Sequence, residues 1–526
     1  MSDAAQEAVA LAAGVVEGAA RRLAALSQNG ADLDSHQVLA YDLAHATAAV
    51  EIARSVLDDD ADSPLAPAFA AEALADLLAR TLGREDMWGT APGWDEPARK
   101  FLADHRDPVF LASLAELEPP RQLDAEFRLV QETFRRFAEE RVLPHAERVH
   151  RHNEDIPEAI VEGLAELGGF GLSVPEEYGG FATGGEHDYL GMVIATEELS
   201  RASLGVGGSL ITRPEILTRA IVNGGTEEQK QELLPRIASG ELMVAVAVTE
   251  PDFGSDVANI TVSATPAEGG GWLINGVKTW CTFAARADVL MLLARTDPDR
   301  SLGHRGLSLF VVEKARGDGH GFVLQQENRS GKLEGRPIDT IGYRGMHSYE
   351  LAFEDWWVPD SALVGGQAGV GRGFYLQMAG FENGRLQTAA RALGVMQAAF
   401  EAAVSYARAR RVFGASIIDY QLTRAKLGRM AAVLHGCRHF AYRVAALMAK
   451  GEGSMEASMV KAYACRAAEW VTREAMQIHG GMGYAEEFPV SRYFLDARVL
   501  SIFEGADETL CLKVIARNLV KRASAA

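Results

Sequence analysis

The stretch MVAVAVTEPDFGSD, residues 243–256, marks the point where the hydrophobic pattern of the chain changes. Before it, apolar residues recur at helical spacing. After it come short β-rich segments separated by Gly, Asp, Asn and Pro clusters, which continue to Pro359. From Gly373 the helical spacing returns and continues towards the C-terminus. The order helices, sheet, helices predicts an α+β fold of several domains, with an antiparallel sheet or a small barrel in the middle.

The same changes of pattern predict the domain boundaries. Residues 1–118 form an acidic, Ala-rich helical extension that carries most of the net charge of -20, and Pro119-Pro120 follow it. We expect a helical domain at 122–242, a middle β-domain at 243–360 and a C-terminal helical bundle at 366–526. The extension is either a partner-docking or regulatory module or a helical bundle packed on the main body, and we favour the second interpretation.

Composition narrows the classes of function. The acidic balance argues against nucleic-acid binding, which needs clustered Lys and Arg, and against electrostatic docking on anionic lipid. Four widely spaced cysteines without a CxxC motif predict neither a disulfide framework nor a zinc site. His435 and His439, on either side of Cys437, are interpreted as residues of a surface helix rather than as metal ligands. No signal peptide or membrane-spanning run is recognised, so we expect a cytoplasmic protein.

Three motifs have the chemistry of a ligand site. Thr249-Glu250-Pro251 with Gly254-Ser255-Asp256 follows a strand-like run, and its hydroxyls and backbone N–H groups suit a phosphate or a ring edge, although an ordinary turn also explains it. QIHGGMGY (477–484) has more glycines than a helix end requires, which indicates close approach of a ligand. FEGA (503–506) places Glu504 among apolar residues, as a desolvated general base is presented, or simply places an acid before a helix.

Five segments in register resemble the acyl-CoA dehydrogenase family over about residues 122–526. They are PEEYGG (175–180), AVTEPDFGSD (247–256), NGVKTWCTF (275–283), ARRVFG (409–414) with Gln421, and QIHGGMGY followed by FEGA. The resemblance implies a helical domain, a β-barrel-like middle domain and a C-terminal four-helix bundle. It also implies FAD as the cofactor, an acyl-CoA substrate, electron-transfer flavoprotein as the electron acceptor, and a homo-oligomer, either a dimer or a tetramer.

The resemblance also implies roles for individual residues. Glu504 matches the catalytic base. The residues expected to line the chain's own FAD are Val248, Thr249, Ser255, Trp280 and Thr282, with Glu508 as a further cofactor contact. Those expected to reach the FAD of a neighbouring subunit are Arg410, Phe413, Gln421, Gln477, Gly480 and Gly481. The substrate contacts are Ser255, Glu382, Arg385 and Gly505, and Arg385 matches the arginine that borders the CoA cleft.

Two departures from the family pattern matter for these roles. Some members carry the base one residue before the position of Arg385, but this chain has Gly384 there, which favours Glu504. The usual Y-E-G-T is F-E-G-A, so Ala506 lacks the hydroxyl of the family threonine. The chemistry requires removal of an α-proton beside a thioester and transfer of a β-hydride to flavin N5, and a carboxylate in a water-poor pocket suits the first of these.

The extension and the FEGA variant are together similar to the methylsuccinyl-CoA dehydrogenases of the ethylmalonyl-CoA pathway, which oxidise (2S)-methylsuccinyl-CoA to mesaconyl-CoA. Such a substrate ends in a carboxylate, and Arg213 is the candidate partner; the alternative is a surface or inter-helix arginine. Other interpretations are a dehydrogenase for an uncharged short or branched acyl-CoA, an acyl-CoA oxidase, and, from another class, a DNA-binding or scaffold flavoprotein relative, which the acidic balance and the intact motifs disfavour.

Overall fold

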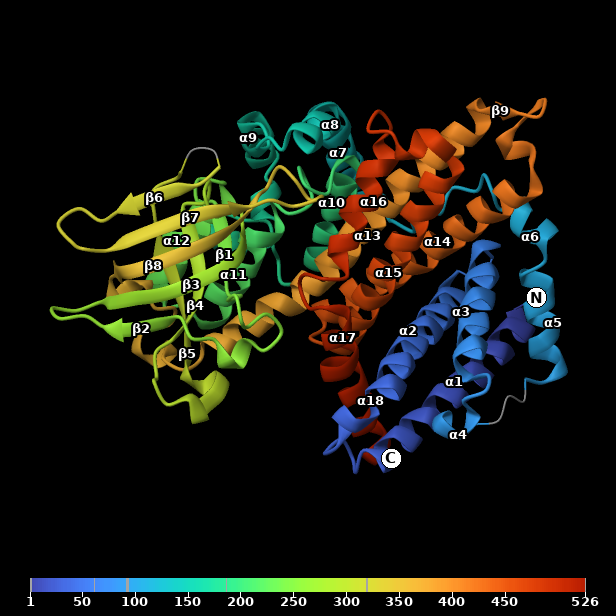
Figure 1. Ribbon diagram of the computed structural model, residues 1–526, viewed down its shortest axis with the longest axis horizontal. Helices are drawn as coiled ribbons and strands as arrows, with labels where there is room; N and C mark the ends of the chain where they lie inside the picture. The colour runs from blue at the N-terminus through green and yellow to red at the C-terminus, as the bar shows by residue number, and fades with distance from the viewer. Residues whose placement is uncertain (1, 61, 91–93, 186, 318–319, 526) are drawn as a thin grey trace. The chain divides into compact units, whose positions relative to one another are not determined.

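The computed structural model describes residues 2–525 apart from residues 61, 91–93, 186 and 318–319. The chain divides into two compact units (Figure 1). Unit 1 is discontinuous in sequence and consists of Met1–Gln131 and Thr388–Ala526, whereas unit 2 is Glu132–Gln387. The N-terminal extension and most of the C-terminal helices therefore belong to one unit.

The N-terminal extension is helical and packs on the C-terminal helices of unit 1. In this unit α2 lies along α15, while α3 and α6 pack on α14, and Figure 1 shows the blue helices beside the orange and red ones. The prediction of a helical bundle packed on the body is confirmed. Its helices are α1 (Ser2–Leu26), α2 (Gln37–Asp59), α3 (Leu65–Thr81), α4 (Glu85–Trp88), α5 (Glu96–His105) and α6 (Pro108–Ser113).

Sequence signals account for these helices. Apolar residues at helical spacing in α2 are buried, including Leu39, Leu43 and Val50. Two short helices begin at an aspartate that accepts backbone N–H groups and is followed by a proline in the first turn: Asp95 accepts from Ala98 N at the start of α5, and Asp107 caps α6. Both the capping carboxylate and the proline favour a helix start.

The C-terminal part of unit 1 forms a bundle of long helices followed by shorter ones. The elements are the second half of α13 (Gly373–Ala409), then α14 (Gln421–Ala449), α15 (Ser454–Ile478), α16 (Pro489–Leu500), α17 (Asp507–Thr509), a π-helical segment η11 (Leu510–Ile515) and α18 (Ala516–Ala525).

The two histidines of α14 differ from their predicted setting. His435 is 1% exposed, with Nε2 3.0 Å from Asp60 Oδ2, and His439 lies close to Ser55. The prediction of a surface helix is wrong for these residues because α2 of the extension covers them.

Unit 2 begins with helices and continues into the sheet. α7 (Ala125–Phe137) passes from one unit to the other, and the PEEYGG motif forms a short 3-10 turn, η4 (Glu176–Tyr178), which ends at Gly179 with φ +84°. The remaining helices are a π-helical segment η2 (Ala138–Val142), α8 (Leu143–His152), α9 (Glu158–Glu166), α10 (His187–Ala202), α11 (Thr212–Gly224) and α12 (Glu227–Ala238). The first half of α13 completes the helical part of this unit.

One eight-stranded sheet forms the middle of the chain, in the order β1-β4-β2-β3-β8-β7-β6 with β5 paired to β4. Most pairs are antiparallel, but β1 runs parallel to β4, and β2 also meets β4 in parallel. The prediction of an antiparallel sheet is wrong for these pairs, because the pattern of apolar residues does not encode strand direction. The strands are β1 (Val244–Ala247), β2 (Ser263–Pro266), β3 (Trp272–Thr282), β4 (Val289–Arg295), β5 (Leu307–Glu313), β6 (Phe322–Gln325), β7 (Lys332–Ile338) and β8 (Ser348–Val358).

A hydrophobic core fixes α11 and α12 against the sheet within unit 2. Ile216 and Leu217 of α11 and Leu234 of α12 pack with strand residues such as Val244 and Met291, all fully or almost fully buried. This packing places α11 beside β1.

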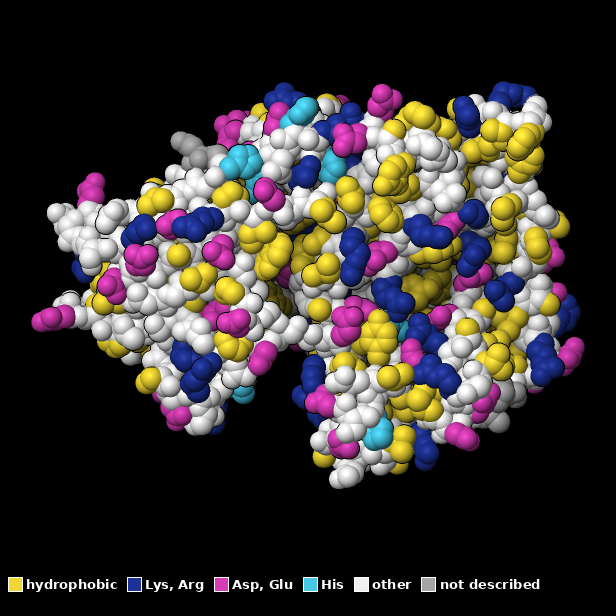
Figure 2. Space-filling model, in the orientation of Figure 1, with side chains coloured by type: hydrophobic (Ala, Val, Ile, Leu, Met, Phe, Trp, Pro, Cys, Tyr) yellow, Lys and Arg dark blue, Asp and Glu magenta, His cyan; other side chains and the backbone are white. Residues whose placement is uncertain are grey.

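On the face drawn in Figure 2, Lys and Arg are interspersed with Asp and Glu. None of the helices in the described part of the chain is both long and apolar enough to cross a membrane.

Candidate active site

The end of β1 and the end of β3 meet to form a corner lined by predicted site residues. Thr279 N donates a hydrogen bond to Thr249 O at 2.8 Å, which joins the TEP motif to the KTWCT motif. Trp280 has φ +58° and lies at an irregular register between β3 and β8, and its side chain is 55% exposed despite its place in a strand. Thr282 is buried with its hydroxyl 3.1 Å from that of Ser348. An exposed aromatic ring beside buried hydroxyls suits a planar ligand.

A buried ion pair supports this corner, and no motif in the sequence predicted it. Lys278 is 0% exposed, and its ammonium donates to Val248 O at 2.8 Å and to Glu250 Oε1 at 2.9 Å. Glu250 also accepts hydrogen bonds from Thr261 N, Thr261 Oγ1 and Val262 N, at 2.7 to 2.8 Å. The sequence does contain a sign of this pair, namely a lysine inside an apolar strand segment, because a buried ammonium needs a partner.

Burial and charge act in opposite directions on this pair. Burial lowers the pKa of Lys278 to about 8, although Glu250 favours the charged form. Burial alone would raise the pKa of Glu250, but the charge and hydrogen bond of Lys278, together with the backbone N–H groups of Thr261 and Val262, outweigh burial, and the net shift is downward. The pair therefore holds the backbone carbonyl of Val248, one residue before Thr249, in a fixed position.

Glu504 lies in a short loop of unit 1 between α16 and α17. The loop is closed by a hydrogen bond from Asp507 N to Ser501 O at 3.1 Å. Glu504 has φ +53° and Gly505 has φ +97°, and Lys461, itself fully buried, donates from Nζ to Gly505 O at 2.6 Å. Glu504 is half-buried, so the loop presents a partly desolvated carboxylate in a strained turn.

A second group of predicted residues lies exposed in unit 1. The hairpin of β9 (Arg411–Val412) and β10 (Ala415–Ser416) carries Phe413 at its tip, 98% exposed and with φ +49°. Tyr406 stacks on His479 with ring centroids 4.2 Å apart, which connects the end of α13 to the QIHGG motif. The other predicted residues of this group are exposed too: Arg410, Gln421, Gln477, Gly480 and Gly481.

The two glycines of this motif are not required by packing within the chain. A Cβ at Gly480 or Gly481 would meet no described atom within 4 Å, although φ is +59° at Gly480. The space beside them is therefore open to the close approach of another molecule.

The predicted substrate residues divide between the units. Arg213 lies in the first turn of α11 and is 8% exposed, so the surface alternative is wrong. Burial raises the pKa of the Cys281 thiol to about 12, and the positive charges of Lys278 and Arg213 oppose that rise. Cys281 lies between Trp280 and Thr282. Glu382 and Arg385, on α13 in unit 2, are half-buried. Ser255 and Glu508 are exposed, and Gly505 belongs to the Glu504 loop.

Family comparisons identify the class of protein that this fold and these residues define. Residues 124–241 match the acyl-CoA dehydrogenase N-terminal domain, residues 245–356 the middle domain, and residues 371–520 the C-terminal domain. The chain belongs to the acyl-CoA dehydrogenase family, and it is an FAD-dependent oxidoreductase that acts on CH–CH groups. The predicted fold class is confirmed, and the extension lies outside the matched domains.

Individual relatives narrow the comparison. The chain is 44% identical over 400 residues to (2S)-methylsuccinyl-CoA dehydrogenase of Cereibacter sphaeroides, a match that covers 76% of this chain and 70% of the relative. A glutaryl-CoA dehydrogenase in complex with glutaryl-CoA is similar with a TM-score of 0.68 and 31% identity, over 76% of this chain and 95% of that chain. A glutaryl-CoA dehydrogenase of Mycobacterium smegmatis with FADH2 has a TM-score of 0.63 and 25% identity, over 74% of this chain and 93% of that one.

The residues of this chain fit the family cofactor. The corner of β1 and β3 offers an exposed indole beside hydroxyl groups, which suits an isoalloxazine ring. A Cβ added at Gly254, next to Ser255, would meet no described atom within 4 Å, so the turn is open to phosphate oxygens that approach its backbone N–H groups. Packing of the core requires neither the exposed indole of Trp280 nor the open turn at Gly254.

Proposed function

We propose that the protein oxidises a short, α-methyl-branched acyl-CoA that ends in a carboxylate, namely (2S)-methylsuccinyl-CoA, to mesaconyl-CoA. The observation that carries the proposal is that Arg213, a charged residue in the first turn of α11, is only 8% exposed. A guanidinium shielded from water binds a carboxylate strongly, through charge-assisted hydrogen bonds that can be bidentate. The similarity to a (2S)-methylsuccinyl-CoA dehydrogenase supports the same substrate.

Glu504 is the proposed base. Its carboxylate removes the α-proton and becomes protonated, while the β-hydride leaves as the C=C bond forms. FAD, when bound, supplies the acceptor for that hydride. The half-buried position of Glu504 limits the water around its carboxylate, which strengthens electrostatic interactions with the reacting atoms. The thioester carbonyl needs hydrogen bonds that strengthen as negative charge develops, and the backbone N–H of Glu504 is one proposed donor.

The role of Glu504 is tested with Glu504→Gln, which keeps the shape and removes the base. We expect this variant to retain FAD and to bind acyl-CoA but to lose flavin reduction, because a general base contributes about 10²–10⁴ in rate. Anaerobic stopped-flow absorbance measures the reduction directly. Flavin reduction at the normal rate in this variant would show that another group removes the proton.

The substrate is tested with Arg213→Met, which removes the charge and keeps an unbranched side chain. We expect kcat/KM for methylsuccinyl-CoA to fall about 10- to 100-fold, the value of a hydrogen bond to a charged group, and that for butyryl-CoA to change little. Arg385→Gln is the matched control, because the proposed CoA contact should affect both substrates equally. Equal losses for both substrates in Arg213→Met would favour the uncharged-substrate alternative.

We also propose that the active form is a homo-oligomer and that electron-transfer flavoprotein reoxidises it. The oligomer is supported by the exposed second group of flavin residues, above all Phe413 at 98% exposure, because a large apolar ring so open to water is typical of an interaction surface.

Mixing the substrate-reduced enzyme with electron-transfer flavoprotein or with oxygen distinguishes a dehydrogenase from an oxidase. Rapid reoxidation by oxygen alone would contradict the proposed acceptor.

A further inference from the structure

The loop that carries Glu504 is held at three points. Ser501 Oγ donates to Glu469 Oε1 at 2.5 Å, and Lys461 Nζ donates to Gly505 O; both partners belong to α15. The third point is Asp507, the first residue of α17. Because both Glu504 and Gly505 have positive φ, the direction of the Glu504 side chain depends on how firmly the two ends of the loop are fixed.

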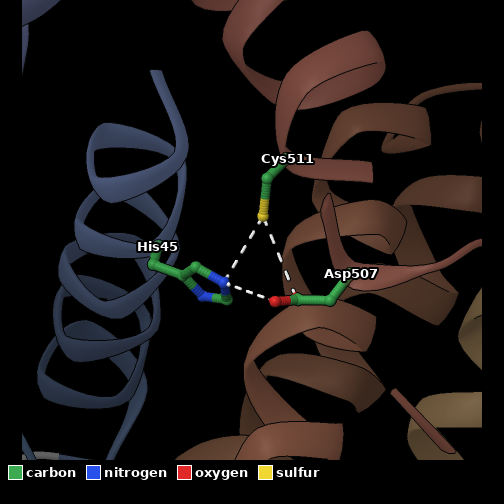
Figure 3. A group of neighbouring side chains, drawn as sticks. All are labelled: His45, Asp507 and Cys511. Carbon is green, nitrogen blue, oxygen red and sulfur yellow. Dashed lines mark hydrogen bonds and ion pairs between the residues drawn. The ribbon is translucent and has the colours of Figure 1, made fainter. Parts of the chain in front are cut away.

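The third anchor comes from the N-terminal extension. Tyr41 of α2 donates from its hydroxyl to Asp507 Oδ2 at 2.6 Å, and His45 Nε2 lies 3.1 Å from the same oxygen. Figure 3 shows His45 of α2 pointing at Asp507. The family match begins at residue 124, so Tyr41 and His45 lie outside the matched family domains.

The carboxylate of Asp507 depends on these partners. It is 7% exposed, and burial alone would raise its pKa, but the hydrogen bonds of His45 and Tyr41 outweigh burial and lower it. Burial also lowers the pKa of His45, so the neutral ring with hydrogen on Nε2 is favoured as the donor. Loss of one donor leaves the buried carboxylate short of a hydrogen bond, which is unfavourable, and a shift of the short loop towards water relieves that penalty.

We propose that Tyr41 and His45 are positioning residues for Glu504, which hold Asp507 by hydrogen bonds and thereby fix the loop that presents the base. This inference rests on the proposed role of Glu504. The extension is then a part of the active centre's support rather than a separate module. Displacement of a catalytic group by about 1 Å costs about 10²-fold in rate, so a weakened anchor has a measurable effect.

The cluster also includes Cys511, which gives it a second interpretation. Its Sγ lies 3.4 Å from His45 Nε2 and 3.9 Å from Asp507 Oδ1 (Figure 3). Cysteine, histidine and aspartate are also zinc ligands. We favour the hydrogen-bonded network because Tyr41 and His45 already provide donors to Asp507.

The test compares Tyr41→Phe, which deletes one hydroxyl, with Glu72→Gln. Glu72 pairs with Arg429 at 2.7 Å and so joins the extension to α14 away from the loop. Three properties are measured on the holoenzyme: the rate of flavin reduction in a single turnover, its isotope effect with α-deuterated substrate, and amide hydrogen exchange of residues 501–507. We expect Tyr41→Phe to slow reduction about 10-fold or more, to raise the isotope effect and to speed exchange in the loop. Glu72→Gln should change none of the three.

The outcomes separate this inference from the proposed function. A lower thermal midpoint in Tyr41→Phe with an unchanged rate and isotope effect would overturn the positioning role, because Tyr41 would then only hold the extension. Additive losses of Tyr41→Phe and Asp507→Asn would also overturn it, since both act through the same bond. Stoichiometric zinc that is lost in Cys511→Ser would replace the network by a metal site. Normal flavin reduction in Glu504→Gln would refute the proposed base instead.

Discussion

Replacing Glu250 by glutamine tests the support of the flavin corner. Glu250 is 3% exposed and accepts four hydrogen bonds, one of them from the fully buried Lys278. Glutamine removes the negative charge and turns one acceptor oxygen into a donor. Breaking a buried ion pair from one side costs about 3–5 kcal/mol, because the other charge stays buried without compensation.

The expected result is a lower midpoint of thermal unfolding. A change of 1 kcal/mol corresponds to about 2–4 °C in a domain of this size, so Glu250→Gln should lower the midpoint of unit 2 by roughly 6–20 °C. FAD retention should fall as well, because Lys278 also fixes Val248 O. Differential scanning calorimetry of the holoenzyme and the absorbance ratio of flavin to protein measure the two effects.

Two controls make the test specific. Glu154→Gln removes the carboxylate that pairs with Arg148, whose side chain is 69% exposed, and should change stability by less than about 1 kcal/mol. Combining Glu250→Gln with Lys278→Met removes both charges and should restore part of the loss. If Glu250→Gln unfolds at the same temperature as Glu154→Gln, the buried pair contributes no more to stability than an exposed one, contrary to the expectation.

Other expected outcomes concern pH, the base loop and the oligomer. Lys278 has a pKa of about 8 in the folded protein, below its ordinary value of 10.5 in the unfolded chain. Between these two pH values the unfolded state binds more protons, so the contribution of Lys278 to stability rises with pH. Lys278→Met should lack that rise in unfolding curves taken from pH 8 upward. Gly505→Ala forces a Cβ to within 2.9 Å of Leu510 at φ +97°, so the folded protein should lose about 1–3 kcal/mol of stability and flavin reduction should slow. The control Gly18→Ala, in open space on α1, should be neutral or stabilising. Phe413→Ser should leave the circular dichroism spectrum unchanged but reduce the oligomer mass in light scattering, and an unchanged mass would remove Phe413 from the interface.

The class of fold could be predicted from the sequence because its signals are local. The change from helical to strand spacing at Met243, the capping aspartates and the glycine turns each act within a few residues. The direction of β1 against β4 was missed, since strand pairing depends on residues that lie far apart in the chain.

The predicted site depends more heavily on context. Glu504, Trp280 and Arg213 were singled out as candidates because each is an unusual residue for its local pattern or matches a family motif. Lys278 and Tyr41 were not, since their importance comes from partners 28 and 466 positions away in the chain, Glu250 and Asp507. Hydrogen-bond partners at such separations are set by tertiary packing, which periodicity does not reveal.

Unit 1 is built from the two ends of the chain, and this has a consequence for how the protein acquires its structure. α14 approaches the extension closely at glycines: a Cβ at Gly428 would meet Leu111 O at 2.0 Å, and one at Gly436 would meet the ring of Phe69 at 2.6 Å. The first helices emerge from the ribosome long before these glycines, with the whole of unit 2 in between. Their apolar faces remain uncovered during synthesis, so folding of unit 1 should be slow, completed after translation, and sensitive to chaperone supply.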